Sequence, residues 1–333
     1  MRGTAMRQRD NVRIRRVTKA FAAAGLALAL AGACTAGTAM VGAQPSGPSV
    51  PFGSTASPMT TSASGGNCNV YASSVSPTTP VPNQSDINAI KARGKLVVGV
   101  AADQYLTGYL GANSVEQGFD IDLAHAIAQS LFGDPNKVKF VALSTDKRIP
   151  DLQNKSVDLV IDTMTITCLR LTEVDFSAVY YNASQKLLVE KGSGYKSLAG
   201  LGGKNVCAQT GSTSIQLIQQ AASTPKPNAI EVTDITDCLV LLQENKVAAI
   251  STDDTILAGL AAQDPNLEVV GTSLSPEPYG IAMRLGATDL EAYVNGVLAQ
   301  YEADGGWAAS YNHWFGSVPG FGAASPPRAQ YSD

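Results

Sequence analysis

Residues 205–263 of the chain read NVCAQTGSTSIQLIQQAASTPKPNAIEVTDITDCLVLLQENKVAAISTDDTILAGLAAQ. Short strand-like runs at 205–208, 230–232 and 247–251 alternate in this stretch with helical patterns at 212–222, 235–244 and 253–263. Because alternating strands and helices favour parallel pairing, the stretch predicts one α/β lobe built on a mostly parallel sheet.

The sequence on either side repeats the pattern. Before the stretch, strand-like runs lie at 95–100, 137–143, 157–161 and 185–190. One apolar-periodic helix lies at 120–132 and is stopped by Gly133. After it, an extended segment at 279–284 is followed by helical sequence at 288–304 and 306–315. Two rounds of strand and helix predict two lobes.

The first 33 residues have the composition of an export signal. Residues 1–20 carry six Arg and one Lys against the single Asp10, and residues 20–33 form an uncharged run dominated by Ala and Leu. Fourteen helical residues span about 21 Å, less than the roughly 30 Å hydrocarbon core of a bilayer. The run ends in Ala31-Gly32-Ala33-Cys34, which resembles a lipobox and predicts a lipid anchor on Cys34. The same residues also fit an ordinary secretory cleavage site, which would give a secreted protein.

Residues 34–85 predict a tether between the membrane and the folded body. No charged residue occurs between residues 20 and 85, and seven prolines lie among Ser, Thr and Gly. Such a composition buries too little apolar surface to fold, so we expect an extended coil. Residues 317–333, with three prolines, predict a second loose end.

Export also bears on the cysteines, because disulfides persist outside the reducing cytosol. If Cys34 carries the lipid, four cysteines remain, and the sequence does not choose among their three pairings. We expect Cys207–Cys238, which lie 31 positions apart in the alternating stretch, and then Cys68–Cys168, which would pin the end of the tether. The alternative is one disulfide and two buried thiols.

Composition argues against several classes of protein. The 24 Lys and Arg against 28 Asp and Glu give a net charge of −4, so there is no positive excess for nucleic acid. Without residues 1–33, 17 basic and 27 acidic residues leave a charge of −10. Only two histidines, His125 and His313, and no CxxC pair argue against a metal or other cofactor.

Catalytic motifs are missing as well. The sequence has no Gly-x-Ser-x-Gly, no His-Glu-x-x-His and no Walker A loop. Ser193 and Lys196 match Ser-x-x-Lys, but the partner motifs of an acylating site are absent. We therefore expect a binding protein and not an enzyme.

Three polar clusters follow predicted strands, where open α/β sheets bind ligands. Hydroxyls and a guanidinium in 163–170 suit a carboxylate, which Arg grips with two parallel hydrogen bonds. The segment 210–214, TGSTS, offers amides and hydroxyls at a helix start, and the segment 252–255, TDDT, offers two carboxylates for an ammonium group. Each cluster alone also fits ordinary helix capping. Together they predict a site for an amino acid.

Six motifs in a fixed order then identify a family resemblance. They are Gly118–Ala124 (GFDIDLA), Thr165-Ile-Thr167 with Arg170, Val174–Ser177 (VDFS), Leu198–Lys204 (LAGLGGK), the Thr-Gly-Ser turn and Asp253-Asp254. Over about residues 88–316 the chain resembles the bacterial extracellular solute-binding proteins of polar amino-acid ABC transporters (family 3). It looks most like the glutamine- and glutamate-binding lipoproteins among them.

The resemblance implies a two-lobe periplasmic-binding-protein fold of type II, with a hinged cleft between the lobes. Lobe 1 would comprise residues 86–181 and 279–316, and lobe 2 residues 182–278. The protein would be a monomer, lipid-anchored on the outer face of the cell membrane. It would capture glutamate or aspartate, or else glutamine or asparagine, by hinge closure and deliver it to an ABC permease. The alternatives are a sensor that presents its closed form to a membrane signalling partner and, less favoured, an enzyme on the same scaffold.

The resemblance also assigns roles to residues. It places the ligand α-carboxylate on Arg170, Thr165 and Ser212 or Thr213, and the α-ammonium group on Asp254 with Thr163. It places the ligand side chain on Arg148 and Thr145, which favours an acidic side chain. The sequence departs from the family at Ala101, where many members have a ligand-binding Asp or Arg. Asp103, Tyr105 and Tyr109 are the nearby candidates for that pocket wall.

Overall fold

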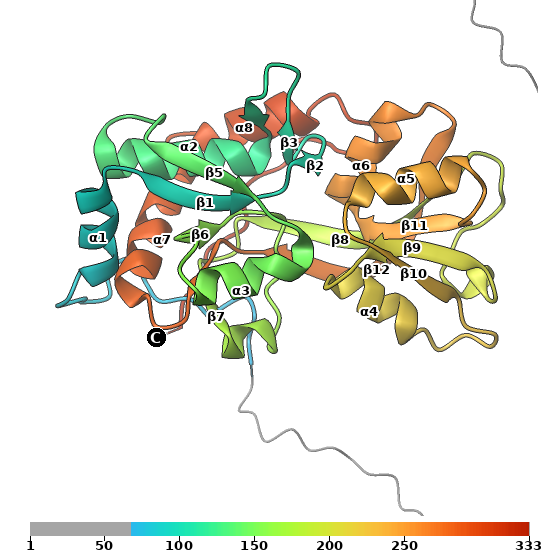
Figure 1. Cartoon of the computed structure of the whole chain (residues 1–333), viewed down its shortest axis with the longest axis horizontal. Helices are drawn as coiled ribbons and strands as arrows, with labels where there is room; N and C mark the ends of the chain where they lie inside the picture. The colour runs from blue at the N-terminus through green and yellow to red at the C-terminus, as the bar shows by residue number, and fades with distance from the viewer. Residues whose placement is uncertain (1–67, 333) are drawn as a thin grey trace, which may run out of the picture. The chain divides into compact units, whose positions relative to one another are not determined.

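Two five-stranded sheets organise the computed structural model, which describes residues 68–332 (Figure 1). The predicted signal peptide 1–33, the predicted lipidation site Cys34 and the tether up to residue 67 lie outside the described residues. Among the residues that are described, no helix is both long and apolar enough to cross a bilayer.

The first sheet has the order β5-β1-β6-β13-β7. Its strands are β1 (Leu96–Val100), β5 (Val138–Ala142), β6 (Leu159–Val160), β7 (Val174–Phe176) and β13 (Ala282–Arg284). Strand β1 is parallel to both neighbours, and its Val98 lies opposite Phe140 and Leu159. Only β13 runs against the other four strands.

The second sheet has the order β10-β9-β11-β8-β12. Its strands are β8 (Tyr181–Glu190), β9 (Asn205–Gln209), β10 (Asn228–Val232), β11 (Ala249–Asp253) and β12 (Leu267–Tyr279). Here β8 alone runs against the rest, since it is antiparallel to both β11 and β12. The prediction of an α/β fold with two lobes is confirmed, and each sheet is mixed, with two parallel and two antiparallel strand pairs.

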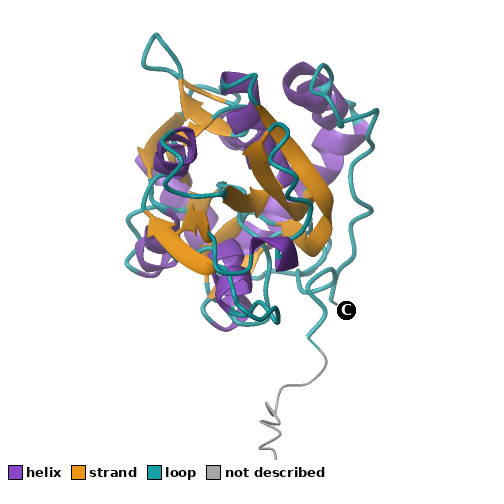
Figure 2. Ribbon diagram, turned by 90° about the vertical axis from the view of Figure 1, so that its right-hand side faces the viewer, coloured by secondary structure: helices purple, strands orange, loops and turns teal. Residues whose placement is uncertain are grey.

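Helices surround the sheets, as Figure 2 shows. The first sheet belongs to lobe 1 and the second to lobe 2. The helices of lobe 1 are α1 (Ser85–Arg93), α2 (Phe119–Phe132), α3 (Arg148–Gln153), α7 (Thr288–Ala303) and α8 (Gly306–Phe315). On lobe 2 they are α4 (Thr213–Gln219), α5 (Ile235–Gln243) and α6 (Asp254–Gln263). The lobe 1 core is rich in aromatic rings, with Phe119 in contact with Trp307 and Phe315. Lobe 2 buries mainly aliphatic side chains around Leu188 and Ile250.

The chain crosses between the lobes at the start of β8 and at the end of β12. These two points lie side by side, because Tyr181 of β8 is paired with Tyr279 of β12. Both strands are long and continue into lobe 2, so the crossing consists of two adjacent strands. Such a crossing suits a hinge, in which a few element-terminal residues take up the motion.

A small sheet of three short strands lies beside α2 in lobe 1. It comprises β2 (Asp103–Gln104), β3 (Gly108–Leu110) and β4 (Glu116–Gln117). The sequence patterns did not predict these strands, which are too short to show periodicity. The sheet matters because β2 carries side chains to the boundary between the lobes.

The N-terminal segment is bound to lobe 1 and corrects the prediction that the tether extends to residue 85. Both expected disulfides, Cys68–Cys168 and Cys207–Cys238, form in the structure, with Cα–Cα distances of 5.9 and 5.6 Å. Buried Glu291 of α7 accepts hydrogen bonds from Ser74 Oγ (2.9 Å) and from the Val75 amide (2.8 Å). The segment is therefore fixed from Cys68 onward, and helix α1 follows it.

The C-terminal segment also packs on lobe 1 and is not loose along its length. Residues 317–332 form no helix or strand beyond one isolated bridge between Ser332 and Val75. The ring of Phe321 stacks on Phe315 at 5.2 Å, and the Tyr311 hydroxyl donates to the Gly322 carbonyl (3.0 Å). Aromatic contacts made at the end of α8 thus hold a segment whose composition predicts a coil.

Candidate functional site

A small polar cavity lies between the lobes, where the carboxyl ends of β6, β9 and β11 meet. Its volume is about 20 Å³, enough for a water molecule and too little for an amino acid. Both lobes contribute to the lining, which consists of Gln104, Thr145, Arg148, Thr163, Thr165, Arg170, Gln209, Ser212, Thr213, Ser214, Thr252, Asp253 and Ile256. All but Ile256 are polar. The three predicted clusters therefore converge at one place.

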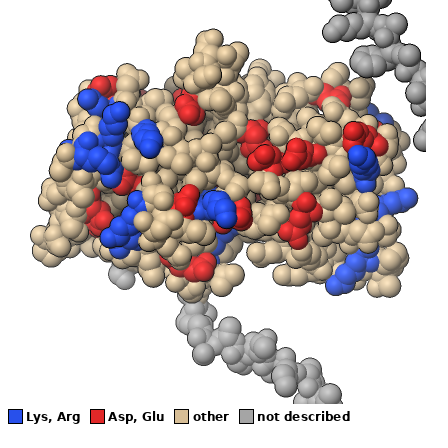
Figure 3. Space-filling model, viewed as in Figure 1, with Lys and Arg blue, Asp and Glu red and all other residues tan. Residues whose placement is uncertain are grey.

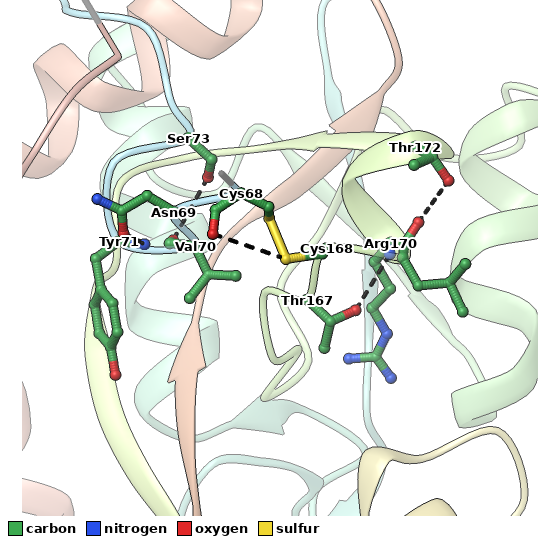
Figure 4. The surroundings of a disulfide bond; sticks show 10 residues. Cys68, Asn69, Val70, Tyr71, Ser73, Thr167, Cys168, Arg170 and Thr172 are labelled. Carbon is green, nitrogen blue, oxygen red and sulfur yellow. Dashed lines mark hydrogen bonds between the residues drawn. A yellow bond between two sulfur atoms is a disulfide. The ribbon is translucent and has the colours of Figure 1, made fainter. Parts of the chain in front are cut away.

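Arg170 reaches the cavity from a 3₁₀ turn, Arg170–Thr172, that follows Cys168. Its amide donates to Thr167 Oγ1 (3.2 Å), and the Cys68–Cys168 disulfide holds the same loop, as Figure 4 shows. The guanidinium donates to the Thr165 carbonyl (2.7 Å) and, across the lobe boundary, to the Gly211 carbonyl (3.3 Å). Burial lowers the pKa of Arg170 to about 9, with nearby Arg148 adding to the effect, so the group stays charged at neutral pH.

Arg148 is the first residue of α3 and is buried beside Arg170 in the same cavity. Its Nε donates to the Thr145 carbonyl (3.0 Å) and its Nη1 to the Asp162 carbonyl (2.9 Å). The Asp162 carboxylate lies 4.0 Å from Nε. Burial raises the pKa of Asp162 to about 7, although the charge of Arg148 opposes that rise. These contacts fix the Arg148 guanidinium in lobe 1 as a second cation of the site.

Asp253, and not Asp254, faces the cavity, which corrects the prediction from the sequence. Asp253 is the last residue of β11 and the N-cap of α6, and its Oδ2 accepts a hydrogen bond from the Tyr279 hydroxyl (2.7 Å). Its Oδ1 is buried and has no hydrogen-bond partner among the described residues. Burial raises the pKa of Asp253 to about 8, and the negative charge of Glu277 adds to the rise.

Asp254 points to the other side of the same junction. It accepts a hydrogen bond from the Ser184 amide (3.2 Å), and its carboxylate lies 3.3 Å from the Lys186 ammonium group. Successive side chains of an extended strand point to opposite faces, so a one-residue difference decides which carboxylate enters the cavity. An Asp-Asp pair at a strand end does not by itself reveal which member faces inward.

The predicted pocket wall is also corrected, because Gln104 lines the cavity in place of Asp103, Tyr105 and Tyr109. Thr163 Oγ1 donates to Gln104 Oε1 (3.0 Å). The Tyr105 and Tyr109 rings pack against each other at 5.0 Å, and Tyr105 lines a separate groove of about 980 Å³. The Asp103 carboxylate instead contacts lobe 2 at the start of α5. In the two-residue strand β2, side-chain alternation turns Gln104 inward and Asp103 outward.

The predicted hydroxyls are present but already hydrogen-bonded. Thr165 Oγ1 and Thr213 Oγ1 both donate to Oε2 of Glu277, at 2.6 and 3.0 Å. Ser212 caps α4 by accepting from the Ile215 amide (3.1 Å), which is the ordinary capping role. Thr163 has a positive φ of 42°. Its amide donates to the buried Asp120 carboxylate (2.8 Å), whose pKa burial raises to about 7.

Glu277 is a buried residue of the site that the sequence patterns did not reveal. It lies on β12 and brings a carboxylate to hydroxyls from both lobes. Its flanking prolines, Pro276 and Pro278, gave no polar pattern to follow. The observed contacts show that these two hydroxyls, one from each lobe, hydrogen-bond a carboxylate.

The charged side chains that line the cavity determine which ligand it can recognise. Among the residues that line it, Arg148 and Arg170 are cationic and Asp253 is the acid. Outside the cavity, acidic and basic side chains are interspersed over the face drawn in Figure 3, without a broad basic field. Recognition of a charged ligand therefore depends on the buried groups. The lining thus carries both signs of charge, two guanidinium groups and one carboxyl group, and the buried acids Asp162 and Glu277 lie next to it.

Comparison with known proteins identifies the family of the chain. Residues 96–317 match the family model described as bacterial extracellular solute-binding proteins, family 3. The ABC transporter glutamine-binding protein GlnH of Bacillus subtilis is 40% identical over 233 residues, which cover 69% of this chain and 85% of that protein. The glutamate/aspartate import solute-binding protein of Escherichia coli is 28% identical over 240 residues, 69% of this chain and 80% of that protein. The structure of an ancestral arginine-binding protein bound to glutamine is similar, with a TM-score of 0.63 and 38% identity, over 68% of this chain and 99% of that one.

Proposed function

The chain belongs to the bacterial extracellular solute-binding proteins, family 3, and from this membership we propose that it captures a polar amino acid between its two lobes. One observation carries the proposal: the Asp253 carboxylate has a buried, unpartnered oxygen in a cavity that also contains Arg170. A buried polar atom without a partner costs free energy, and an α-ammonium group would supply that partner. Arg170, with Thr165 and Thr213 beside it, would then hold the α-carboxylate.

The charges favour glutamate or aspartate as the ligand. After Asp253 and Arg170 have bound the α-groups, Arg148 is the remaining cation in the lining, with Thr145 beside it. A side-chain carboxylate would give that cation a second acidic partner beside Asp162, which lies 4.0 Å from its Nε, and the low dielectric makes a charged pair strong at short range. An amide side chain would leave Arg148 with a weaker partner. Glutamine and asparagine are therefore the second choice, and the glutamine-binding relative supports keeping them.

Binding requires the lobes to separate, because the cavity is smaller than any amino acid. The two crossing strands β8 and β12 allow this motion. In the open state, lobe 1 would present Arg148 and Arg170 to the ligand. Closure would then bring Asp253 and Thr213 from lobe 2. A ligand that contacts both lobes binds the closed form more tightly, and this difference in affinity drives closure.

We infer that the closed protein delivers its amino acid to an ABC permease from a lipid anchor at Cys34. The relative named as an ABC transporter component and the basic, then apolar, residues 1–33 support this role. Uptake of labelled glutamate by cells that lack the gene tests it. Loss of uptake supports delivery, whereas unchanged uptake with an altered response to external glutamate would favour the sensor.

The binding proposal itself is tested with Arg170→Ala in a thermal-shift and calorimetric screen of the twenty amino acids. A ligand at one hundred times its Kd stabilises the folded state by about 2.7 kcal/mol, which is readily seen. We expect Arg170→Ala to weaken binding at least about 100-fold, since the ligand carboxylate would be buried without its cation. The control is Arg284→Ala, which removes an Arg paired with Asp86 on the opposite edge of lobe 1. Affinity within threefold of wild type in Arg170→Ala would contradict the proposal.

A further inference from the structure

The two lobes also touch outside the ligand cavity, at the N-terminus of α5. Oδ2 of Asp103 in lobe 1 accepts hydrogen bonds from two backbone amides of lobe 2, those of Ile235 (2.7 Å) and Thr236 (3.4 Å). The helix has its own N-cap residue, Asp234, but that side chain makes no capping hydrogen bond. The cap of this lobe 2 helix is thus supplied by the other lobe.

A second contact between the lobes lies at α6. Gly259 of lobe 2 packs on the backbone of Tyr105 in lobe 1 so closely that a Cβ at this position would lie 2.1 Å from the Tyr105 carbonyl oxygen. Real Cβ atoms do not approach oxygen to this distance, so only glycine allows the contact. Gly259 has the ordinary backbone angles of a helix, and alanine would favour the helix itself. The glycine therefore serves the contact with Tyr105 and not the conformation of α6.

We propose that Asp103 and Gly259 form a closure contact, separate from the ligand groups, which sets the balance between open and closed lobes and thereby the affinity for the amino acid. The proposal rests on the proposed function, since affinity is coupled to closure only if the ligand binds between the lobes. None of Asp103, Tyr105, Ile235 and Gly259 lines the cavity. They act through the position of the lobes and not by touching the ligand.

The physical basis is that both contacts exist only in the closed form. When the lobes part, the amides of Ile235 and Thr236 lose their carboxylate, and water must replace it. A side-chain cap at a helix N-terminus is favourable, and the charge of the carboxylate also suits the positive end of the helix dipole. The contact therefore stabilises closure whether or not a ligand is present. The apparent affinity follows from the fraction of molecules that can close.

The test compares Asp103→Ala with Asp234→Ala in the full chain. Asp234 lies at the same helix end and is exposed, but makes no capping hydrogen bond, so it controls for the loss of charge. Fluorophores are introduced as unnatural amino acids at Lys139 and Lys204, one exposed residue on each lobe, which leaves the cysteines untouched. Single-molecule energy transfer reports the closed fraction without ligand, and calorimetry reports the affinity for L-glutamate.

We expect Asp103→Ala to lower the closed fraction and to weaken L-glutamate binding roughly 3- to 30-fold, the range expected for loss of a cap. Gly259→Ala should weaken it about 5- to 100-fold through the steric clash, while the melting temperature of the ligand-free protein does not fall. Asp234→Ala should match wild type in both assays. The proposal is overturned if Asp103→Ala behaves like Asp234→Ala, or if Gly259→Ala closes normally.

The two proposals fail in different ways. If no polar amino acid binds the wild-type protein, the proposed function is wrong, whereas the closed fractions of the ligand-free variants still decide whether the closure contact exists. If L-glutamate binds the wild type and all three variants with equal affinity, the closure contact is wrong and the proposed function stands.

Discussion

Replacing Asp253 with asparagine should stabilise the ligand-free protein and abolish its binding of an amino acid. Burial holds the pKa of Asp253 at about 8 in the folded state, against an ordinary value of 3.8. A raised folded pKa means that the carboxyl group favours folding at low pH and that this contribution is lost as the pH rises from 3.8 through 8. At pH 7 the solution lies about three pH units above the ordinary pKa, and each of these units costs the folded state about 1.4 kcal/mol relative to the unfolded state. Asparagine carries no such cost, so we expect Asp253→Asn to raise the free energy of unfolding by on the order of 4 kcal/mol.

The assay is urea unfolding of both proteins without ligand, at pH 7 and at pH 5. The stability difference should shrink by more than half at pH 5, because little more than one pH unit then separates the solution from the ordinary pKa. Asp254→Asn is the matched control and should gain nothing, since Asp254 is paired with Lys186 outside the cavity. If Asp253→Asn is no more stable than wild type at pH 7, or if its gain does not depend on pH, the description of Asp253 as a buried carboxyl without a partner is refuted.

Three further predictions concern the same cavity. Arg148→Met should weaken L-glutamate binding at least about tenfold more than L-glutamine binding, because a carboxylate depends more on the cation; equal losses by calorimetry would contradict an acidic ligand. Ligand binding at pH 7 should release up to about one proton, since the ligand ammonium group lowers the raised pKa of Asp253. Calorimetry in buffers of different ionisation enthalpy measures the number of protons released, and proton uptake on binding would contradict the prediction. Replacing both Cys68 and Cys168 with serine should weaken ligand binding, because it loosens the loop that carries Arg170. Replacing Cys207 and Cys238 in the same way should lower stability with little change in affinity. Equal effects of the two changes on affinity would show that the first disulfide does not position Arg170.

The parts of the fold that the sequence predicts are those set by local pattern. Alternating runs in residues 205–263 predict the strands and helices of lobe 2 because each element buries one side against its neighbour. Arg148 and Arg170 converge in the cavity because both follow strands whose carboxyl ends meet at one edge. The pairing of the four cysteines also agrees with the expectation.

The features that escaped prediction depend on single-residue geometry or on long-range contacts. Asp253 and Asp254 have the same chemistry, and only the junction between β11 and α6 decides which one is buried. Gln104 lies on a two-residue strand that no periodicity can reveal. Glu291 binds the N-terminal segment more than 200 residues away, so the local composition of that segment says nothing of the contact.

Calorimetric titration of the wild-type protein, stripped of ligand by unfolding and refolding, with L-glutamate, L-aspartate, L-glutamine, L-asparagine and glutarate tests whether Asp253 holds the ammonium group of an amino acid. Glutarate keeps both carboxylates of glutamate and lacks only the ammonium group that we assign to Asp253. We expect at least one of glutamate, aspartate, glutamine and asparagine to bind, and glutarate to bind at least about 100-fold more weakly than glutamate, since it leaves the buried Asp253 oxygen unpaired. Glutarate affinity equal to that of glutamate, or no binding by any of the four amino acids, would contradict this expectation.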